Sequence, residues 1–343
     1  MAKKNTKNPL IFIVLIVSIV LFVILPNEPS ASLSQSAAAG KRPSRIISVI
    51  PAVTEMLFAL GAGPEVVAVG TFDQYPPEVA KLPRVGALLD PDLERILSLR
   101  PDLVVVYESQ SDFRQQLERA AVPTFVYKHA GLADITETIR RLGARIGREV
   151  EAAATVRKIE DQLAAIRKRV AGRPKPRTLL VFDRDALALR GIYASGGVGF
   201  LQDMLDVAGG ENVFGDVQRQ SLQATTELIL ARRPDVVIEF RSGTLTPEQR
   251  SKEIAVWQNL PSVPAVRSKR ITIITDQRAV VPGPRVAEGT ELIARAIHPD
   301  AFDNFRLPGS GVPGSGVQGS RFKVQGSGFR VLFKKLHGHN RKP

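Results

Sequence analysis

The sequence of 343 residues contains no cysteine. This absence excludes disulfide bonds, thiolate catalysis, metal sites built from cysteine and a lipid anchor on an N-terminal cysteine. Histidine is also scarce: the four residues lie at positions 129, 298, 337 and 339, and none forms the helix-face pair of an HExxH site. We therefore expect neither a resident metal nor a cofactor.

Acidic residues are absent from one end of the chain and rare at the other. Residues 306–343 hold eight Lys or Arg and no acid, and residues 1–43 hold five basic residues and one acid. Residues 44–305 hold 34 basic and 33 acidic residues, so the net charge of +13 belongs to the ends. A nearly neutral body offers no electrostatic surface for nucleic acid, and we expect no such partner.

Motifs of catalytic and nucleotide-binding loops are missing too. Gly196-Gly-Val-Gly199 departs from the GxGxxG spacing, and Ser195 does not lie in a GxSxG turn. The sequence therefore favours a protein that is not an enzyme. A two-lobed enzyme, such as a chelatase or a nucleotide-dependent transferase, is the weakest of the alternatives.

A single long apolar run, residues 10–25, follows Lys3, Lys4 and Lys7. A Ser/Ala-rich stretch then ends in Ser36-Ala-Ala-Ala-Gly40. We interpret residues 1–43 as a signal peptide, or as an N-terminal membrane anchor plus a spacer. Both place the body outside the cytoplasm, in the periplasm or at the outer face of the cytoplasmic membrane. At the other end, residues 305–343 are basic and rich in Gly and Ser, which predicts a disordered tail.

Short apolar segments alternate with helical patterns through the body. This alternation predicts an α/β protein with two Rossmann-like lobes, residues 44–147 and 172–304, each built on a parallel sheet. The expected strands are 45–50, 65–70, 103–107, 124–127, 177–182, 236–240 and 271–274, and the expected helices are 54–60, 93–99, 111–120, 199–207 and 254–260.

A long amphipathic helix is predicted between the lobes. Apolar residues at positions 156, 159, 163, 166 and 170 are spaced three or four apart, with charged residues opposite. Residues 148–171 therefore form one connecting helix, about 35 Å long at ~1.5 Å per residue. A single helix makes a stiff joint, so we predict little closure when a ligand binds.

One segment occurs twice, 133 residues apart. Residues 92–106 and 225–239 share a helix, a Pro-Asp pair and a strand, and Glu94 of the first copy corresponds to Glu227 of the second. An acid at a helix start can be explained by the helix dipole alone. Matched glutamates in two lobes instead favour a docking role, because exposed carboxylates suit arginine pockets on a partner. Asp102 and Asp235 are interpreted as structural residues at strand starts.

Aromatic residues follow strands in both lobes. Phe72 and Tyr75 come after the second predicted strand, and Phe182 and Tyr193 belong to the corresponding region of the second lobe. Open α/β sheets bind ligands at the carboxyl ends of their strands. These four residues are therefore candidates for a ligand-binding cleft.

Several motifs, in this order, resemble one family. They are Arg45-Ile-Ile-Ser-Val-Ile-Pro-Ala-Val-Thr-Glu55, Tyr75-Pro-Pro77, Leu93-Glu-Arg-Ile96, Arg100-Pro-Asp102 and Gly209-Gly-Glu-Asn-Val-Phe214. Over residues 44–300 the chain resembles the periplasmic substrate-binding proteins of ABC importers for cobalamin, haem and iron–siderophores, and is most similar to the cobalamin-binding branch.

The resemblance implies two lobes joined by a rigid helix and no catalysis. It places the family's permease-docking glutamates on Glu94 and Glu227. It also implies ligand contacts from Phe72 and from the loop that begins near Asp276 and Arg278.

The chain departs from this family at the ligand. Cobalamin binders of this kind line the cleft with tryptophan, whereas the single tryptophan here, Trp257, lies outside those positions and is interpreted as a packing residue. A corrinoid could stack on Phe72, Tyr75 or Phe182. Arg184, Arg278 and Arg285 could instead face an anionic chelate or haem propionates.

The resulting hypothesis is the solute-binding component of an ABC importer. It would capture cobalamin or a related metal chelate and dock on a permease served by ATPase subunits, with the N-terminal segment as its contact with the membrane. A haem or ferric-siderophore binding protein is the first alternative. A membrane-anchored ligand sensor without transport is the second.

Overall fold

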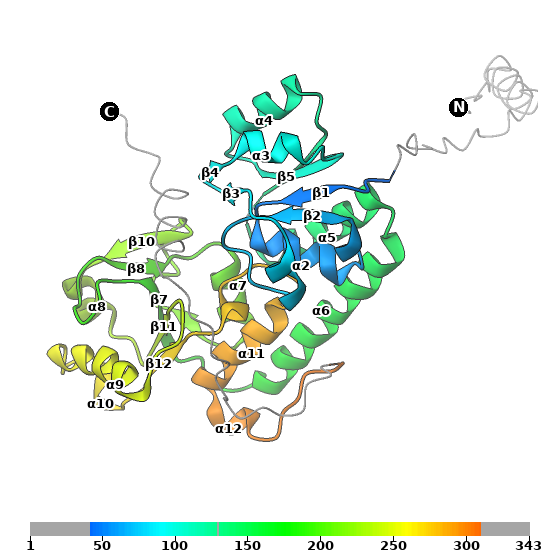
Figure 1. Cartoon of the computed structure of the whole chain (residues 1–343). Coiled ribbons are helices and arrows are strands. Elements are labelled where there is room, and N and C mark those ends of the chain that lie inside the picture. The colour runs from blue at the N-terminus through cyan, green and yellow to red at the C-terminus, as the bar shows by residue number, and fades with distance from the viewer. Residues whose placement is uncertain (1–41, 129, 310–343) are drawn as a thin grey trace, which may run out of the picture. The chain divides into compact units, whose positions relative to one another are not determined.

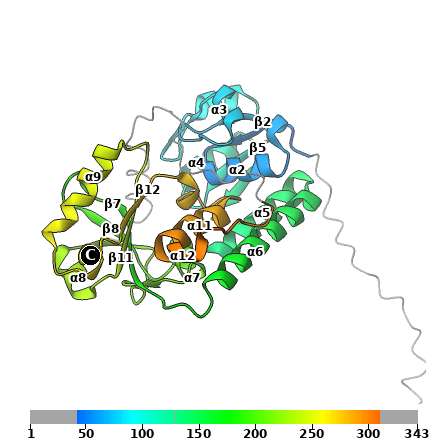
Figure 2. The same cartoon turned by 90° about the horizontal axis from the view of Figure 1, so that it is seen from below.

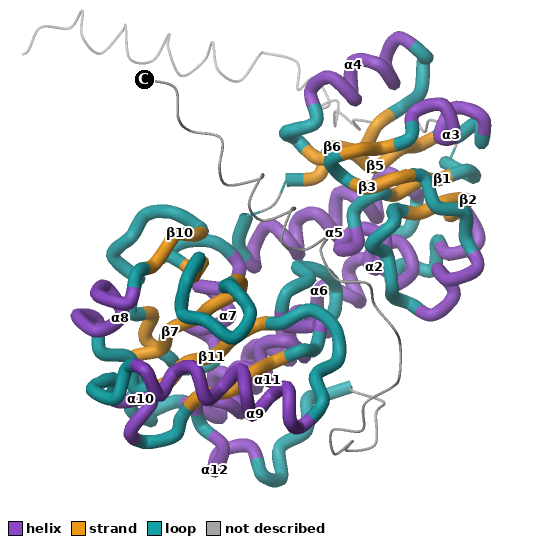
Figure 3. The backbone as a smooth tube through the Cα atoms, turned by 60° about the vertical axis from the view of Figure 1, so that its left-hand side comes forward, coloured by secondary structure: helices purple, strands orange, loops and turns teal. Residues whose placement is uncertain are grey.

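The computed structural model describes residues 42–128 and 130–309. The predicted signal or anchor segment at residues 10–25 and the tail from residue 310 onward lie outside these ranges. Among the described residues, no helix combines the length and apolar character needed to cross a bilayer. Figure 1 shows the element order, and Figure 3 shows the strands gathered in two groups, one in each lobe.

The N-terminal lobe is built on a four-stranded sheet in the order β2-β1-β5-β6, and every pair is parallel as predicted. Its elements are β1 (Ile46–Ser48), α2 (Pro51–Ala59), β2 (Val66–Val69), β3 (Gly86–Ala87), β4 (Asp90–Pro91), α3 (Leu93–Ser98), β5 (Leu103–Tyr107), α4 (Ser111–Arg119) and β6 (Thr124–Tyr127), with short 3-10 helices at Gly63–Glu65 and Pro77–Lys81. Helix α2 starts three residues before the predicted position because Pro51 occupies its first turn, where its missing N–H costs nothing.

The C-terminal lobe contains a larger sheet in the order β10-β8-β7-β11-β12, with β9 also paired to β7. Its elements are β7 (Arg177–Asp183), β8 (Ile192–Ser195), α7 (Phe200–Val207), β9 (Glu211–Asn212), β10 (Ser221–Ala224), α8 (Thr226–Arg232), β11 (Val236–Phe240), α9 (Pro247–Ala255), a 3-10 helix η3 (Val256–Asn259), α10 (Pro264–Arg267), β12 (Ile271–Ile274), a 3-10 helix η4 (Gln277–Ala279), α11 (Val286–Ile297) and α12 (Pro299–Phe302).

This second sheet is not wholly parallel, which corrects the sequence prediction. Strands β7, β11 and β12 are parallel, but β8 runs antiparallel to both β7 and β10. The loop 184–191 is too short for a crossover helix, so β8 must return beside β7 as a hairpin. Asp185 donates its N–H to the Arg190 carbonyl at 2.9 Å, and Gly191 supplies the positive φ of +58° that the turn needs.

One predicted helix has different bounds. The sequence placed a helix from Ile254 to Leu260, but α9 begins at Pro247 and gives way to the 3-10 helix η3 at Val256. A capping box explains the earlier start: the Thr246 hydroxyl accepts from the Gln249 N–H, and the Gln249 side chain accepts from the Thr246 N–H.

The predicted long helix is present as α6 (Glu149–Val170), and a second helix, α5 (Leu132–Ile146), precedes it. Gly147, with φ of +67°, separates the two, because a left-handed residue ends α5 and lets the chain turn. Helix α6 packs against α5 as well as against α7, α11 and α12 of the C-terminal lobe (Figure 2).

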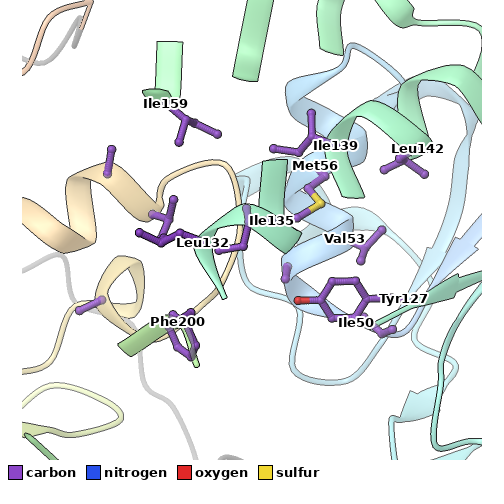
Figure 4. Close-up of a cluster of buried hydrophobic side chains, with 14 of the residues drawn as sticks. Ile50, Val53, Met56, Tyr127, Leu132, Ile135, Ile139, Leu142, Ile159 and Phe200 are labelled. Atoms are coloured by element: carbon purple, nitrogen blue, oxygen red, sulfur yellow. The ribbon is translucent and has the colours of Figure 1, made fainter. Parts of the chain in front are cut away.

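A single hydrophobic core continues from one lobe into the other. Figure 4 shows Met56 of the N-terminal lobe beside Ile135 and Ile139 of α5, and the same core extends to Phe200 of α7. A second, separate core lies in the C-terminal lobe and includes Trp257. The shared core means that moving one lobe against the other would disturb close-packed side chains.

The two copies of the repeat fold alike. After α3 and after α8 the chain adopts a left-handed residue, Arg100 with φ of 49° or Arg233 with φ of 50°. The aspartate that follows then binds the strand beside it: Asp102 accepts from the Arg45 N–H at 2.8 Å, and Asp235 accepts from the Arg177 N–H at 3.0 Å. Both aspartates therefore have the structural role expected of them.

Candidate functional site

The loop after β2 presents two of the predicted ligand residues. Phe72 is 40% exposed and Tyr75 is 42% exposed, unusually high values for large aromatic side chains. Arg84 fastens the backbone of this loop by donating to the carbonyl oxygens of Gly70 at 2.8 Å and Asp73 at 2.7 Å. The loop is thus held at its base while its aromatic rings remain accessible.

Asp73 lies in the same loop but points inward. It is 1% exposed, and neither carboxylate oxygen has a hydrogen-bond partner among the described residues. Burial raises its pKa to about 7, and the nearby Thr54 hydroxyl and Arg84 guanidinium only partly oppose this effect. The carboxyl beneath the aromatic loop is therefore neutral below about pH 7 and loses its proton near that pH.

The segment after β12, which belongs to the C-terminal lobe, reaches this aromatic loop. The Gln277 side chain donates to the Gln74 side-chain oxygen at 2.6 Å. The Arg285 guanidinium lies over the Tyr75 ring, 3.7 Å from its centroid, and forms two hydrogen bonds with Glu55 of α2 at 2.8 and 2.5 Å. The structure thus brings together Tyr75 and the segment that contains Asp276 and Arg278.

Arg278 is engaged by neighbouring carboxylates. It binds Asp276 through two nitrogens at 2.9 and 2.5 Å, and Glu288 of α11 through a third at 2.9 Å. Burial pushes the pKa of Asp276 upward, but the hydrogen bonds from Arg278 outweigh burial and lower it. Asp276 and Arg278 therefore stabilise the segment in which they lie.

Phe182 and Tyr193 lie elsewhere. Phe182 is 5% exposed and sits inside β7, and Tyr193 of β8 is half-buried against the same core. Their rings are 6.3 Å apart between centroids and tilted by 37°. Both aromatics contribute to packing in this structure.

Arg184 is buried inside the C-terminal lobe. It is 1% exposed and contacts Glu239 of β11 at 2.7 Å and Glu253 of α9 at 2.9 Å. Trp257 donates its indole N–H to the same Glu239 at 2.6 Å, which agrees with its expected packing role. With Arg278 and Arg285, all three arginines suggested for an anionic ligand are thus bound to carboxylates of the protein.

This buried network also holds a loop residue that no sequence pattern singles out. Leu187, at the tip of the β7–β8 hairpin, is 58% exposed and has a positive φ of 53°. Its N–H donates to Glu253 at 3.3 Å, and Arg184 donates to the carbonyls of Asp185 and Ala188. An exposed leucine on a fastened loop is a candidate apolar contact.

Glu94 and Glu227 occupy matching positions and are both exposed. Each lies two residues after a capping side chain, Asp92 for α3 and Thr225 for α8. Hydrogen bonding to Thr225 lowers the pKa of Glu227, so its carboxylate is ionised at neutral pH. Both glutamates have the exposure and local geometry that an ionic contact with a partner requires.

The described residues offer no group of three or more histidine and acidic side chains that could hold a metal ion. Glu55, Asp73 and Glu239 are ionisable residues that were not selected from the sequence. Glu239 had a signal, because it is a charge inside an apolar strand. Glu55 had none, because its partner Arg285 lies 230 positions away.

Comparisons with known proteins agree with this architecture. The chain is 30% identical over 289 residues to the ABC transporter substrate-binding lipoprotein YvrC of Bacillus subtilis, covering 81% of this chain and 88% of that protein. It is 30% identical over 225 residues to the vitamin B12-binding protein of Salmonella typhimurium, covering 65% and 80% of the two chains.

Two solved structures are similar in fold. A possible iron-binding periplasmic protein from Staphylococcus epidermidis matches with a TM-score of 0.65 and 26% identity, covering 75% of this chain and all of that one. The periplasmic haem-binding protein RhuT from Roseiflexus matches with a TM-score of 0.64 and 25% identity, covering 75% and 99%. The family model described as periplasmic binding protein matches residues 46–278. The chain therefore belongs to the periplasmic binding protein family.

Proposed function

We propose that this protein captures cobalamin, or a related metal chelate, between its lobes and then docks on an ABC permease through Glu94 and Glu227. The observation that carries the proposal is the pair of exposed glutamates at equivalent positions of two matching lobes. A partner with one arginine pocket for each lobe would be recognised by both carboxylates. ATPase subunits of the importer would supply the energy for release.

The proposed ligand surface consists of Phe72 and Tyr75, next to the segment from Asp276 to Arg278. Flat exposed rings suit the face of a large macrocycle, because stacking needs area rather than charge. Phe182 and Tyr193 are not included, because Phe182 lies in the core and Tyr193 packs against it. The protein would work outside the cytoplasmic membrane, in contact with it through residues 10–25, without a cofactor and without catalysis.

Haem and ferric siderophores are the competing ligands, because relatives of similar fold are described as haem-binding and iron-binding. The engagement of Arg184, Arg278 and Arg285 by protein carboxylates favours a ligand that does not depend on them for charge. Titration of the purified protein with cyanocobalamin, haemin and a ferric hydroxamate, followed by visible absorbance, tests the choice. Binding of haemin alone would exclude cobalamin.

Docking is tested separately from capture. The variant Glu94→Ala with Glu227→Ala is expected to abolish chelate uptake by cells while leaving the Kd of the purified protein unchanged. Glu248 offers a matched control: it is exposed, lies in the first turn of α9 and follows a capping threonine, as Glu227 does. Glu248→Ala should leave uptake intact.

Loss of ligand affinity in the double variant would contradict the docking assignment. If instead the protein binds a chelate tightly but cells that lack the protein take up that chelate at the wild-type rate, a sensor without transport becomes the better interpretation.

A further inference from the structure

Tyr75 has one face covered by a charge from the opposite lobe. The Arg285 guanidinium carbon lies 3.7 Å from the centre of the Tyr75 ring, well inside the range of a cation–π contact. Arg285 immediately precedes α11 of the C-terminal lobe, whereas Tyr75 lies in the loop after β2 of the N-terminal lobe. Tyr75 remains 42% exposed, so the contact leaves much of the side chain accessible.

Glu55 fixes the guanidinium in that place. It is 4% exposed, and its two oxygens accept from Nε and Nη2 of Arg285 at 2.8 and 2.5 Å. This paired geometry fixes the plane of the guanidinium as well as its position. Gly283 lies close to the pair, since a Cβ there would come 3.3 Å from a Glu55 oxygen.

The segment that carries Arg285 is itself anchored. Arg278 ties the segment to Glu288 of α11, and the Arg278 carbonyl lies so close to Gly289 that a Cβ there would clash at 2.0 Å. From this anchored segment, Gln277 also donates to Gln74, the neighbour of Tyr75. Two independent contacts thus run from one lobe to the same aromatic loop.

We propose that Arg285 is a positioning residue: held by Glu55, it fixes the Tyr75 ring so that the accessible face is set before a ligand arrives. The ligand class is a flat ring system that stacks on that face. The assignment of Tyr75 to the ligand rests on the proposed function, but the fixing of the loop does not. Pre-setting a ring strengthens binding because less freedom is lost on association.

The first measurement needs no ligand. Amide hydrogen exchange of the peptide covering residues 70–79 is compared in the wild type, Arg285→Met, Arg285→Lys and Glu55→Gln. We expect exchange to rise at least about tenfold in Arg285→Met and Glu55→Gln, and by less in Arg285→Lys, which keeps the charge. Unchanged exchange in Arg285→Met and Glu55→Gln overturns the proposal.

Arg148→Met is the matched control. Arg148 also makes an inter-element ion pair, with Glu65 at 3.0 Å, but away from the aromatic loop. This variant should leave exchange of residues 70–79 at the wild-type rate. An equal rise in the control would show that the effect is general loosening, and would count against Arg285.

The second measurement is a double-mutant cycle on affinity for cyanocobalamin, or for whichever of haemin and the ferric hydroxamate the wild type binds. Arg285→Met should weaken binding about tenfold in the wild-type background and have little effect when Tyr75 is already alanine. Equal weakening in both backgrounds would mean that Arg285 acts independently of Tyr75, and would overturn the positioning role. If no chelate binds the wild type while the exchange result holds, the proposed function fails and the fixing of the loop stands.

Discussion

The two copies of the repeat end differently: β5 carries Val106 where β11 carries Glu239. Both positions are buried, so the N-terminal lobe fills its sheet with an aliphatic side chain and the C-terminal lobe places a carboxylate there. Arg184, Arg241 and Trp257 bind that carboxylate. The N-terminal lobe has its own buried acid, Asp73, whose carboxylate oxygens accept no hydrogen bond from the residues that the structure describes.

This difference separates two uses of a buried charge. In the C-terminal lobe the Glu239 carboxylate is paired with cations and an indole N–H, and Arg184 of the same network holds the hairpin that carries Leu187. In the N-terminal lobe the acid is unsatisfied beneath the loop that presents Phe72 and Tyr75. One network therefore supplies rigidity, whereas the other acid can gain or lose a proton near neutral pH.

The largest effect is expected from breaking the satisfied network. Arg184→Met leaves Glu239 buried without its main cation, and removing one partner of a buried pair typically costs about 3–5 kcal/mol. Urea unfolding followed by circular dichroism measures the loss. Arg241→Met should cost less, because the Arg241 side chain is 17% exposed and Arg184 remains.

The comparison with β5 suggests a second substitution that should restore stability. Adding Glu239→Val to Arg184→Met gives β11 the aliphatic residue of its counterpart, and should recover part of the lost stability. A double variant less stable than Arg184→Met would show that the buried carboxylate is not the source of the penalty.

Asp73, the buried acid without hydrogen bonds from the described residues, should make the stability of the protein depend on pH. Burial raises the pKa of Asp73 from 3.8 to about 7, so the folded state keeps a proton that the unfolded chain has already released. Its contribution to stability therefore falls as the pH rises from about 4 to about 7, by up to roughly 1.4 kcal/mol for each pKa unit. Asp73→Asn should be more stable than the wild type at pH 8, and its gain should be clearly smaller at pH 5, where only the first part of this loss has occurred.

Urea unfolding at both pH values provides the test. Glu65→Gln is a control for loss of an acid in the same lobe, since Glu65 is paired with Arg148. An identical pH profile for Asp73→Asn and the wild type would show that Asp73 does not titrate in this range.

Much of the fold could be predicted because its signals are local. The repeat, the parallel strands and the long helix α6 follow from apolar patterns and from Pro-Asp pairs within a few residues. The β7–β8 hairpin was missed because Arg190 and Gly191 form a turn that resembles any other loop in sequence. Helix α5 was missed as a separate element because Gly147 is a weak signal within a long run without proline.

The candidate site was less accessible to sequence reasoning. Phe182 looked like a strand-end residue, but β7 continues to Asp183, and alternation along the strand turns the Phe182 ring into the core beside Leu180. The arginines looked free because their carboxylate partners are mostly remote: Glu55 and Arg285 belong to different lobes, and only tertiary structure joins them. The exposure of a side chain is difficult to predict from the local sequence, and a pair formed by residues far apart in the sequence is harder still.

The smallest effect concerns the aspartates at the two strand starts. Asp102 accepts from the N–H groups of Ser44 and Arg45 and from the Ser44 hydroxyl, whereas Asp235 accepts from the Arg177 N–H. The residue equivalent to Ser44 in the second lobe is Pro176, which has no N–H to donate. At about 1 kcal/mol for each net hydrogen bond, Asp102→Ala should cost roughly 3 kcal/mol and Asp235→Ala roughly 1 kcal/mol.

The stability that Asp102 contributes should disappear at low pH. Burial opposes ionisation of Asp102, but the hydrogen bonds from Ser44 and Arg45 together outweigh it and lower the pKa. The stability that Asp102 adds is therefore present above the pKa of the unfolded chain and is lost as the pH falls through the lower folded value. Urea unfolding of Asp102→Ala and the wild type should differ at pH 7 and converge toward pH 3. A difference that persists in acid would mean that Asp102 acts through packing rather than through its charge.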